Sequence, residues 1–334
     1  MARVAVIPAS SMTGAFCARE LLSGGTTTGG PALLRLAFRS EEAASAYHHF
    51  AHKRSNVEIV ATADAGVQGS LLSVLEGMDT AVLVTPHDHA RGFGKDADMS
   101  VAMVKAAVDA GCKRIVHVGS WTVKAPSALP SLASRFVPTE EYLRSSAVPR
   151  DVEWTVLRGG YFMNNIGAMF HPSLSSGGAT IKFPAVKVAM IDARDIGMAA
   201  AALCRLRPGA EFAAYDRACL ECSGPEMLTF GDVAAKLSAA TGRSIAFEED
   251  GVEVWCSGKP PAMQELLRFM AAQQGGAVPF APGALEPLLG RPPRSFDDFA
   301  WDHALGYMWG PGADPQCVPS WGEALMEMKT APLA

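Results

Sequence analysis

A turn of small residues near the start of the chain has the composition of a phosphate-binding loop. It follows the apolar run Val4–Ile7, precedes a helical pattern and reads Pro-Ala-Ser-Ser-Met-Thr-Gly. A strand, a tight turn and a helix in this order present helix N-terminal N–H groups to an anion such as a pyrophosphate. The spacing G-x-x-G-x-x-G would place glycines at 8, 11 and 14, and only Gly14 is present. Hydroxyls at Ser10, Ser11 and Thr13 are available to donate hydrogen bonds in place of the missing glycines. We expect the cofactor phosphates to contact Ala9, Ser10, Ser11, Met12, Thr13 and Gly14.

Arg39 and Ser40 form the second chemical signal, because they follow the next apolar run, Leu33–Phe38. An acidic residue at this strand end would bind the ribose 2′-hydroxyl of NAD, whereas an arginine suits the 2′-phosphate of NADP. No acidic residue precedes Arg39 here. We therefore predict NADP(H) as cofactor. Binding of NAD(H), and a loop that has lost its cofactor beside a solvated arginine, stay open as alternatives.

Composition narrows the class of protein. The 334 residues are 49% hydrophobic, enough for one large domain or two of ordinary size. The net charge of −5 is spread along the chain, which argues against nucleic acid as a partner. No uninterrupted apolar stretch reaches the length of about 18 residues that a membrane span needs. The seven cysteines are scattered without zinc spacing, so we expect reduced thiols, a cytoplasmic protein and no metal.

Short apolar runs alternate with helical patterns through the first half of the chain. Such runs, continuous rather than alternating, are typical of strands buried on both faces of a parallel sheet. We predict an α/β fold, a doubly wound parallel sheet of the Rossmann type. The predicted strands are Val4–Ile7, Leu33–Phe38, Val57–Thr62, Ala81–Val84, Arg114–Val118 and Trp154–Leu157. The predicted helices are Gly14–Leu22, Glu41–Lys53, Ser70–Leu75, Ala97–Ala110 and Thr139–Ser145.

The alternation ends near residue 160. We expect a Rossmann domain over 1–160 and a smaller mixed C-terminal lobe over 161–334, partly interleaved with the first domain and bearing the substrate. This lobe is predicted to contain a strand at Val186–Ile191 and helices at Ile196–Leu206, Thr229–Ala240 and Pro261–Ala272. The Gly- and Pro-rich stretch Gly275–Pro293 is predicted to be loop.

Several segments together resemble one family. The most specific lies in Glu153–Asn165, where Arg158-Gly-Gly-Tyr-Phe-Met-Asn-Asn is similar to an Arg-Pro-x-x-Phe-x-x-Asn motif. The others are Val57–Asp64, Leu71–Pro86, Arg114–Ser120, Glu140–Ser146, Asp192–Gly197, Leu220–Thr229 and Phe296–His303. In order and spacing the set resembles the NmrA-like branch of the atypical short-chain dehydrogenases/reductases. The resemblance implies a Rossmann-type domain, a cleft against a C-terminal lobe, and usually NADP(H).

Two departures from the family pattern bear on the chemistry. The loop glycines are missing, and Phe136 stands about where many reductases of this family carry a lysine near the nicotinamide. The Tyr-x-x-x-Lys pair of many short-chain dehydrogenases is absent too, because Ser146 lies four residues after Tyr142. A site poor in general acids suits a substrate that arrives electrophilic and needs hydride but little proton transfer.

The ends of the fourth to sixth strands are expected to line the nicotinamide. Tyr161 and Ser120 are the candidate catalytic groups, and core packing or a backbone hydrogen bond are their alternative roles. The remaining candidate cofactor contacts are Asp64, Thr85, Pro86, Gly119 and Phe162. Candidate substrate contacts are Trp121, His87 and Met163, and for Trp121 a place in the core is an equal alternative.

The sequence thus predicts an NADPH-dependent reductase that transfers hydride to a small, largely apolar, electrophilic molecule of quinone, enone or imine/iminium type. One alternative is a non-catalytic NADP(H)-binding sensor that responds to cofactor by changing its contacts with a partner. A weaker one is a lyase, isomerase or scaffold on the same fold. The oligomeric state is left open.

Overall fold

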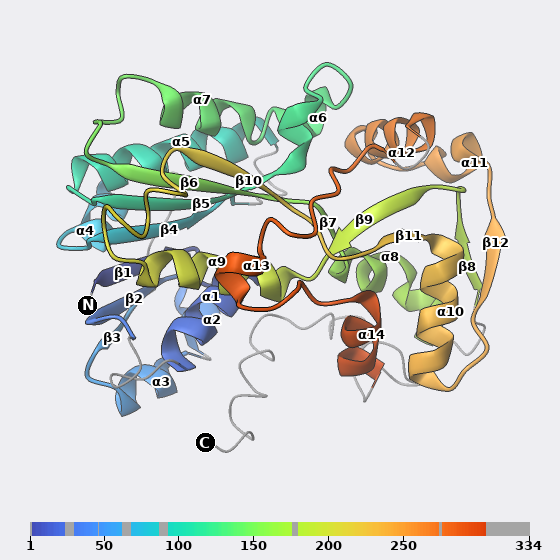
Figure 1. The fold of residues 1–334 in the computed structure, drawn as a ribbon, viewed down its shortest axis with the longest axis horizontal. Helices are drawn as coiled ribbons and strands as arrows, with labels where there is room; N and C mark the ends of the chain where they lie inside the picture. Colours follow the sequence, from blue (N-terminus) through green and yellow to red (C-terminus); the bar gives the residue numbers. More distant parts are fainter. Residues whose placement is uncertain are drawn as a thin grey trace.

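A seven-stranded parallel sheet forms the centre of the protein in the computed structural model, which describes residues 2–23, 30–45, 47–61, 68–86, 93–175, 180–273 and 276–304. The strand order β10-β6-β5-β4-β1-β2-β3 reverses direction beside β1, as in a doubly wound fold (Figure 1). This confirms the predicted fold class. The strands are β1 Arg3–Ile7, β2 Leu33–Ala37, β3 Val57–Val60, β4 Thr80–Val84, β5 Arg114–Ser120, β6 Glu153–Gly159 and β10 Ala218–Cys222.

Helices cover both faces of this sheet. The helices α1 (Met12–Ser23) and α9 (Ala193–Arg205) pack on one face, with α2 (Glu41–Ser45) and α3 (His48–Lys53) beside them. The other face carries α4 (Gln68–Leu75), α5 (Phe93–Asp109) and α7 (Val137–Arg144). The 3-10 helix η1 (Trp121–Lys124) and α6 (Pro130–Ala133) connect β5 to α7. Because both faces are covered, the strands are mostly apolar.

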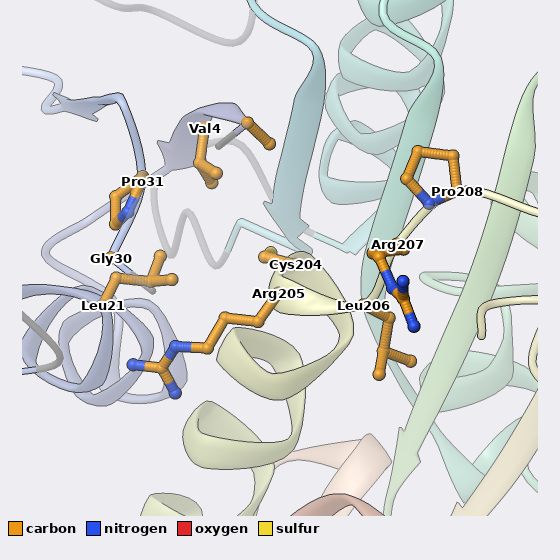
Figure 2. A pocket seen from close by; sticks show the side chains of 10 residues that line it. Val4, Leu21, Gly30, Pro31, Cys204, Arg205, Leu206, Arg207 and Pro208 are labelled. Carbon is orange, nitrogen blue, oxygen red and sulfur yellow. The ribbon is translucent and has the colours of Figure 1, made fainter. Parts of the chain in front are cut away.

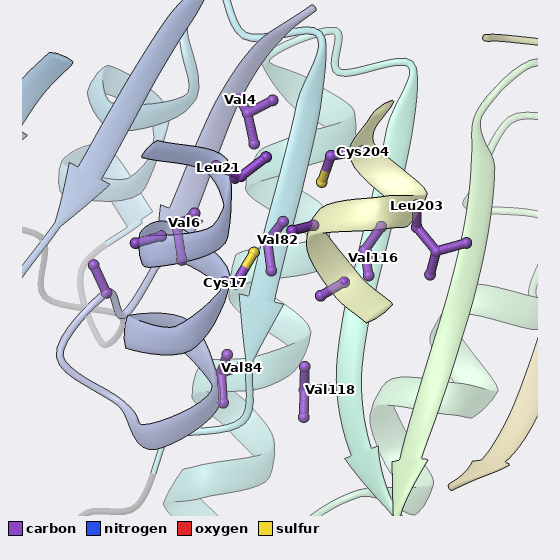
Figure 3. Close-up of a cluster of buried hydrophobic side chains, with 14 of the residues drawn as sticks. Val4, Val6, Cys17, Leu21, Val82, Val84, Val116, Val118, Leu203 and Cys204 are labelled. Carbon is purple, nitrogen blue, oxygen red and sulfur yellow. The ribbon is translucent and has the colours of Figure 1, made fainter. Parts of the chain in front are cut away.

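Side chains alternate between these two faces along each strand. On β4 and β5, Val82, Val84, Val116 and Val118 belong to the cluster that faces α1 and α9 (Figure 3). Their neighbours Ala81, Leu83 and Ile115 belong to the cluster under α4, α5 and α7. The alternation therefore decides which face each polar residue near the strand ends occupies.

The helices α1 and α9 pack unusually closely, because α9 presents a glycine to α1. A methyl group on Gly197 would lie 2.5 Å from Phe16 Cβ and 2.9 Å from the Thr13 carbonyl oxygen. The Arg194 guanidinium lies over the Phe16 ring, 5.7 Å from its centroid. Arg205 pairs with Glu20 at 3.0 Å near the other ends of the two helices. The two N-termini therefore lie together at the carboxyl edge of the sheet.

The later part of the chain also builds two smaller sheets beside the main one (Figure 1). Phe183 and Phe230 pack with ring centroids 3.9 Å apart in the centre of this region, and Trp255 meets Phe183 edge-on. The strands are β7 Tyr161–Phe162, β8 Thr180–Phe183, β9 Lys187–Ile191, β11 Met227–Thr229 and β12 Ala246–Glu249. The helices are α8 Asn164–Ser175, α10 Phe230–Thr241, α11 Val252–Cys256, α12 Pro261–Ala272, α13 Glu286–Leu289 and α14 Phe296–Ala304.

Several elements differ from the sequence-based predictions. The predicted helix Glu41–Lys53 is two short helices, because Tyr47 turns inward and packs its ring 4.5 Å from that of Phe38. The strand β10 was not predicted, and it pairs in parallel with β6 at the edge of the main sheet. The predicted loop Gly275–Pro293 contains the single turn α13, which ends at Gly290 in the left-handed conformation (φ 66°).

Candidate functional site

The loop after β1 is held rigidly at the carboxyl edge of the sheet. Ala9 is fully buried, and its N–H donates to the carbonyl of Ala37 at the end of β2 (2.9 Å). The Tyr47 hydroxyl donates to the Ala9 carbonyl from the other side at 3.4 Å. The first residues of the predicted phosphate loop are thus fixed by β2 and by the segment between α2 and α3.

Ser11 serves as the N-cap of α1. Its Oγ accepts a hydrogen bond from the Gly14 N–H (3.1 Å) and donates to the Pro8 carbonyl (2.8 Å). The hydroxyl that the sequence offered to a phosphate is therefore used within the loop. Gly14 allows this geometry, because a methyl group there would lie 2.4 Å from the Pro8 oxygen and 2.6 Å from Ser11 Oγ.

Three backbone amides of this loop have no acceptor among the described residues, namely those of Ser10, Met12 and Thr13. Two of them belong to the first turn of α1, where the helix dipole places partial positive charge. The N-terminus of a 12-residue helix with donors left over is a ready site for an anionic oxygen. The loop can bind a pyrophosphate through its backbone without the missing glycines.

Arg39 and Ser40 lie directly beyond β2, next to this loop in the sheet order. Arg39 is exposed, and Ser40 caps α2 by accepting from the Ala43 N–H at 3.2 Å. A side chain at this position reaches the same edge as the α1 N-terminus. The candidates Asp64 and His87 lie outside the described residues.

The ends of β4 and β5 bring four candidate residues together. The Thr85 N–H donates to the Val118 carbonyl at 3.4 Å, which joins the two strand ends beside Gly119 and Ser120. Ser120 Oγ accepts from the N–H and the hydroxyl of Thr122 (3.3 and 3.1 Å), so it caps η1. The Pro86 carbonyl accepts from Arg135, whose guanidinium also pairs with the buried carboxylate of Asp96 at 2.8 Å. These contacts place Thr85, Pro86, Gly119 and Ser120 next to one another at the carboxyl edge of the main sheet.

The other candidates near β6 are mostly directed into the core of the later region. Tyr161 is 5% exposed, and its hydroxyl donates to Met169 Sδ at 3.0 Å. Burial raises the pKa of Tyr161, which makes its phenol a weaker acid than usual. Trp121 and Met163 are buried in the same core, and Trp121 stacks with Phe269 of α12 at 6.2 Å between centroids. Phe162 packs over Gly159 at the strand end.

A buried ion-pair network near this edge was missed by the sequence reasoning. Glu140 of α7 accepts two hydrogen bonds from Arg158 of β6 (2.8 and 2.6 Å) and one from Arg144 (2.8 Å). Arg158 also donates to Glu221 of β10 at 2.6 Å. Burial acts to raise the pKa of Glu140, but the hydrogen bonds from Arg158 and Arg144 outweigh it and hold that pKa below its ordinary value. The arginine of the family motif was the available signal, because a strand arginine on a buried face requires a partner.

A second polar cluster anchors the start of α9. Asp192, fully buried, caps the helix by accepting from the Arg194 N–H (2.9 Å) and pairs with Arg294 at 3.0 Å. Asp195, also buried, accepts from the Arg294 N–H and from Arg291 (2.6 Å each). Capping is the role expected of an aspartate that directly precedes a helix. The pairs with Arg291 and Arg294, about a hundred residues further on, could not be anticipated from it.

A surface hollow lies at the opposite edge of the sheet, where β1 starts and where α1 and α9 end (Figure 2). Its lining residues are Ala2, Val4, Leu21, Gly30, Pro31, Cys204, Arg205, Leu206, Arg207 and Pro208. It contains none of the candidate site residues. In the described part of the chain, no cluster of three or more His, Cys, Asp or Glu side chains could hold a metal, and no helix has the length and apolarity of a membrane span.

The sequence model of the NmrA-like family matches residues 1–274. Among curated proteins, the (4-alkanoyl-5-oxo-2,5-dihydrofuran-3-yl)methyl phosphate reductase of Streptomyces griseus is 31% identical over 259 residues, which cover 76% of this chain and 85% of that protein. The NAD(P)H azoreductase of Xenophilus azovorans is 28% identical over 300 residues, covering 86% and 98% of the two chains.

Among solved structures, the Citrobacter sp. triphenylmethane reductase complexed with NADP(H) superposes with a TM-score of 0.70 at 19% identity. The match covers 91% of this chain and all of the other. At this identity the likeness concerns the fold. Together with the sequence matches it confirms the resemblance on which the sequence interpretation drew.

Proposed function

The chain belongs to the NmrA-like family, and on that premise we propose that it is an NADPH-dependent reductase. The observation that carries the proposal is the set of three amides, at Ser10, Met12 and Thr13, that find no acceptor in the part of the chain that the structure describes, beside the exposed Arg39. The amides supply donors for the pyrophosphate, and Arg39 supplies a cation for the 2′-phosphate. The curated relatives, both named as reductases, support the same class.

The cofactor is proposed to lie along the carboxyl edge of the sheet. The strand order puts the end of β2 with Arg39 on one side of the α1 loop and the ends of β4 and β5 on the other. The adenosine half then occupies the Arg39 side, and the nicotinamide half lies over Thr85, Gly119 and Ser120. A nicotinamide at this edge would transfer its hydride to a substrate that lies between the main sheet and the later region.

The substrate is proposed to be a small, largely apolar molecule that is already electrophilic. Of the two candidate catalytic groups, Tyr161 donates its proton to Met169 inside the protein, whereas Ser120 accepts from Thr122 and offers only a weakly acidic hydroxyl. Hydride transfer to an iminium ion gives a neutral amine, and transfer to a conjugated carbonyl compound or a quinone gives a delocalised anion, so these acceptors place little demand on a protein acid. The S. griseus relative is named for the methyl phosphate of an alkanoyl-5-oxo-2,5-dihydrofuran. Its conjugated carbonyl ring supports an electrophilic substrate, whereas its phosphate makes that compound anionic.

A fluorescence titration with NADPH tests the cofactor assignment. We expect wild type to bind NADPH, and Arg39→Ala to lose about 1.5–3 kcal/mol of binding free energy, the contribution of hydrogen bonds to a charged group. The same change should leave NADH affinity nearly unchanged. Arg207→Ala, which removes an exposed arginine at the opposite edge, is the matched control and should bind as wild type does. Equal losses of NADPH and NADH in Arg39→Ala would contradict the 2′-phosphate assignment.

Turnover is tested separately, by following NADPH absorbance with a quinone, an α,β-unsaturated lactone and an imine as trial acceptors. Consumption of NADPH with one of these classes is the expected result. NADPH binding without consumption by any of them would favour the non-catalytic sensor. Absence of NADPH binding by wild type would reject both.

A further inference from the structure

A fully buried histidine lies directly beneath the proposed nicotinamide position. Val84, Val116 and Val118 face α1 and α9 (Figure 3). His117 of β5 and Thr85 after β4 alternate with these valines, so they project onto the face covered by α5 and α7. His117 Nε2 is 3.4 Å from Thr85 Oγ1, the outer limit of a hydrogen bond. His117 is 0% exposed, whereas Thr85 is half-buried at the sheet edge. One partner of the pair therefore meets solvent and the other does not.

The surroundings of His117 determine which of its nitrogens carries the proton. Burial lowers its pKa to about 4, although the carboxylate of Glu140 and a hydrogen bond with the backbone of Leu83 oppose this, so the ring is neutral at pH 7. Nδ1 is buried without a hydrogen-bond partner among the described residues. Burying an N–H group without an acceptor costs more free energy than burying a nitrogen lone pair without a donor. We therefore place the single ring proton on Nε2. His117 then donates to Thr85.

This polarity fixes what the Thr85 hydroxyl can do. Its oxygen accepts from His117, so its own proton is directed away from the histidine. Within the described residues the other nearby acceptor is the Val118 carbonyl, also at the long distance of 3.4 Å. A ligand oxygen at the strand end would be a better acceptor. Thr85 is thus prepared as a one-way donor at the sheet edge.

We propose that His117 is a positioning residue, which holds the Thr85 hydroxyl as a hydrogen-bond donor to the nicotinamide riboside half of the bound cofactor. The proposal rests on the proposed function, because it takes the cofactor to lie along this edge. The sheet order supports the assignment, since β4 and β5 lie on the side of the α1 loop away from Arg39. Ribose oxygens and the carboxamide oxygen of that half are acceptors of the required kind.

Two ligands separate this role from a merely structural one. NADPH contains the nicotinamide riboside, whereas adenosine 2′,5′-bisphosphate contains only the adenosine half. We expect Thr85→Val to weaken NADPH binding by about three- to tenfold, the effect of one neutral hydrogen bond, and to leave bisphosphate binding unchanged. Thr85→Ser should bind NADPH as wild type does. The matched control is Thr80→Val, which removes a threonine hydroxyl at the other end of β4.

The histidine is tested by a pair of substitutions. Gln carries a donor nitrogen near the position of Nε2, so His117→Gln should retain most of the NADPH affinity. His117→Leu should show the same selective loss as Thr85→Val. In wild type, the ring ¹⁵N signals of His117 should report the Nε2–H tautomer at pH 7 without any cofactor present. That measurement keeps the proposal testable where His117→Leu fails to fold.

The outcomes distinguish this proposal from the proposed function. Wild type that binds NADPH while Thr85→Val binds equally well rejects the role of Thr85 and leaves the reductase assignment standing. A charged ring or an Nδ1–H tautomer rejects the role of His117. Equal losses of NADPH and bisphosphate in Thr85→Val indicate a distorted sheet edge and also overturn the proposal. Wild type that binds neither ligand rejects the proposed function, and this inference with it.

Discussion

Replacing Gly14 by alanine tests whether the loop after β1 is the anion site. The added methyl would lie 2.4 Å from the Pro8 carbonyl oxygen and 2.6 Å from Ser11 Oγ, both well inside van der Waals contact. The first of these atoms belongs to the backbone, so the loop and α1 must separate. Overpacking of this kind costs about 1–3 kcal/mol of stability.

The same displacement should move the amides of Met12 and Thr13 away from a bound phosphate. Loss of even one hydrogen bond to a charged group weakens binding by about 1.5–3 kcal/mol, at least tenfold in the dissociation constant of NADPH. We expect both effects in Gly14→Ala, measured by chemical denaturation and by fluorescence titration. Adding Ser11→Ala should not restore binding, because the clash with the Pro8 oxygen remains.

Gly69→Ala is the matched control, because a methyl on this exposed glycine of α4 meets nothing within 4 Å. Helix propensity predicts that it is neutral or up to about 1 kcal/mol more stable, with unchanged NADPH affinity. A Gly14→Ala protein with wild-type stability and affinity would refute the reasoning. Lost stability with unchanged affinity would show that the loop is structural and that the phosphates bind elsewhere.

Three further predictions concern the surrounding supports. Tyr161→Phe removes only the hydrogen bond to Met169, so we expect it to lose less than about 1.5 kcal/mol of stability. Its kcat should be close to that of wild type, and a large fall in kcat would instead indicate that Tyr161 is a catalytic group. Gly197→Ala should destabilise by about 1–3 kcal/mol in denaturant, because its methyl would lie 2.5 Å from Phe16 Cβ; wild-type stability would contradict the close packing of α1 on α9. Glu140→Gln should cost up to about 3 kcal/mol at pH 7, because Arg144 loses its carboxylate partner and Arg158 keeps only its pair with Glu221. The folded pKa of Glu140 is depressed, so the stabilisation from its carboxylate is present above the unfolded value of 4.5 and is lost as pH falls through the folded pKa. The difference in stability between wild type and Glu140→Gln should therefore shrink in acid. A difference independent of pH would contradict an origin in the charge of Glu140.

The central strands could be predicted from the sequence because burial on both faces makes them continuous apolar runs, as in Thr80–Val84. The strand β10 escaped this test. Its residues Ala218–Cys222 are mostly half-buried at the sheet edge, and it joins the sheet through pairing with β6, more than sixty residues earlier. An edge strand of this kind has little local signal, and its partner is set by the fold.

The position of the loop between β1 and α1 could be predicted, whereas the use of its hydroxyls could not. Ser11 was a candidate phosphate donor by residue type, but the Pro8 carbonyl folds back within reach and takes its proton. Likewise Glu140 and Arg158 are ordinary charged residues in the sequence. They become a buried pair because α7 lies on the face of β6 that carries Arg158. Such pairings depend on the three-dimensional contact and have no fixed spacing along the chain.

The proposed cofactor edge depends on the whole chain more than its sequence motif suggests. The α1 N-terminus is confined by Pro8 and Ser11 on one side and by Gly197 of α9 on the other. The start of α9 is in turn anchored through Asp192 to Arg294, close to the last helix described. A short loop that lacks two of its three glycines can therefore keep a defined geometry, because distant packing supplies the constraint that glycine-rich sequence supplies elsewhere. The ability of this loop to bind an anion therefore depends more on the backbone amides that lack acceptors among the described residues than on the number of its glycines.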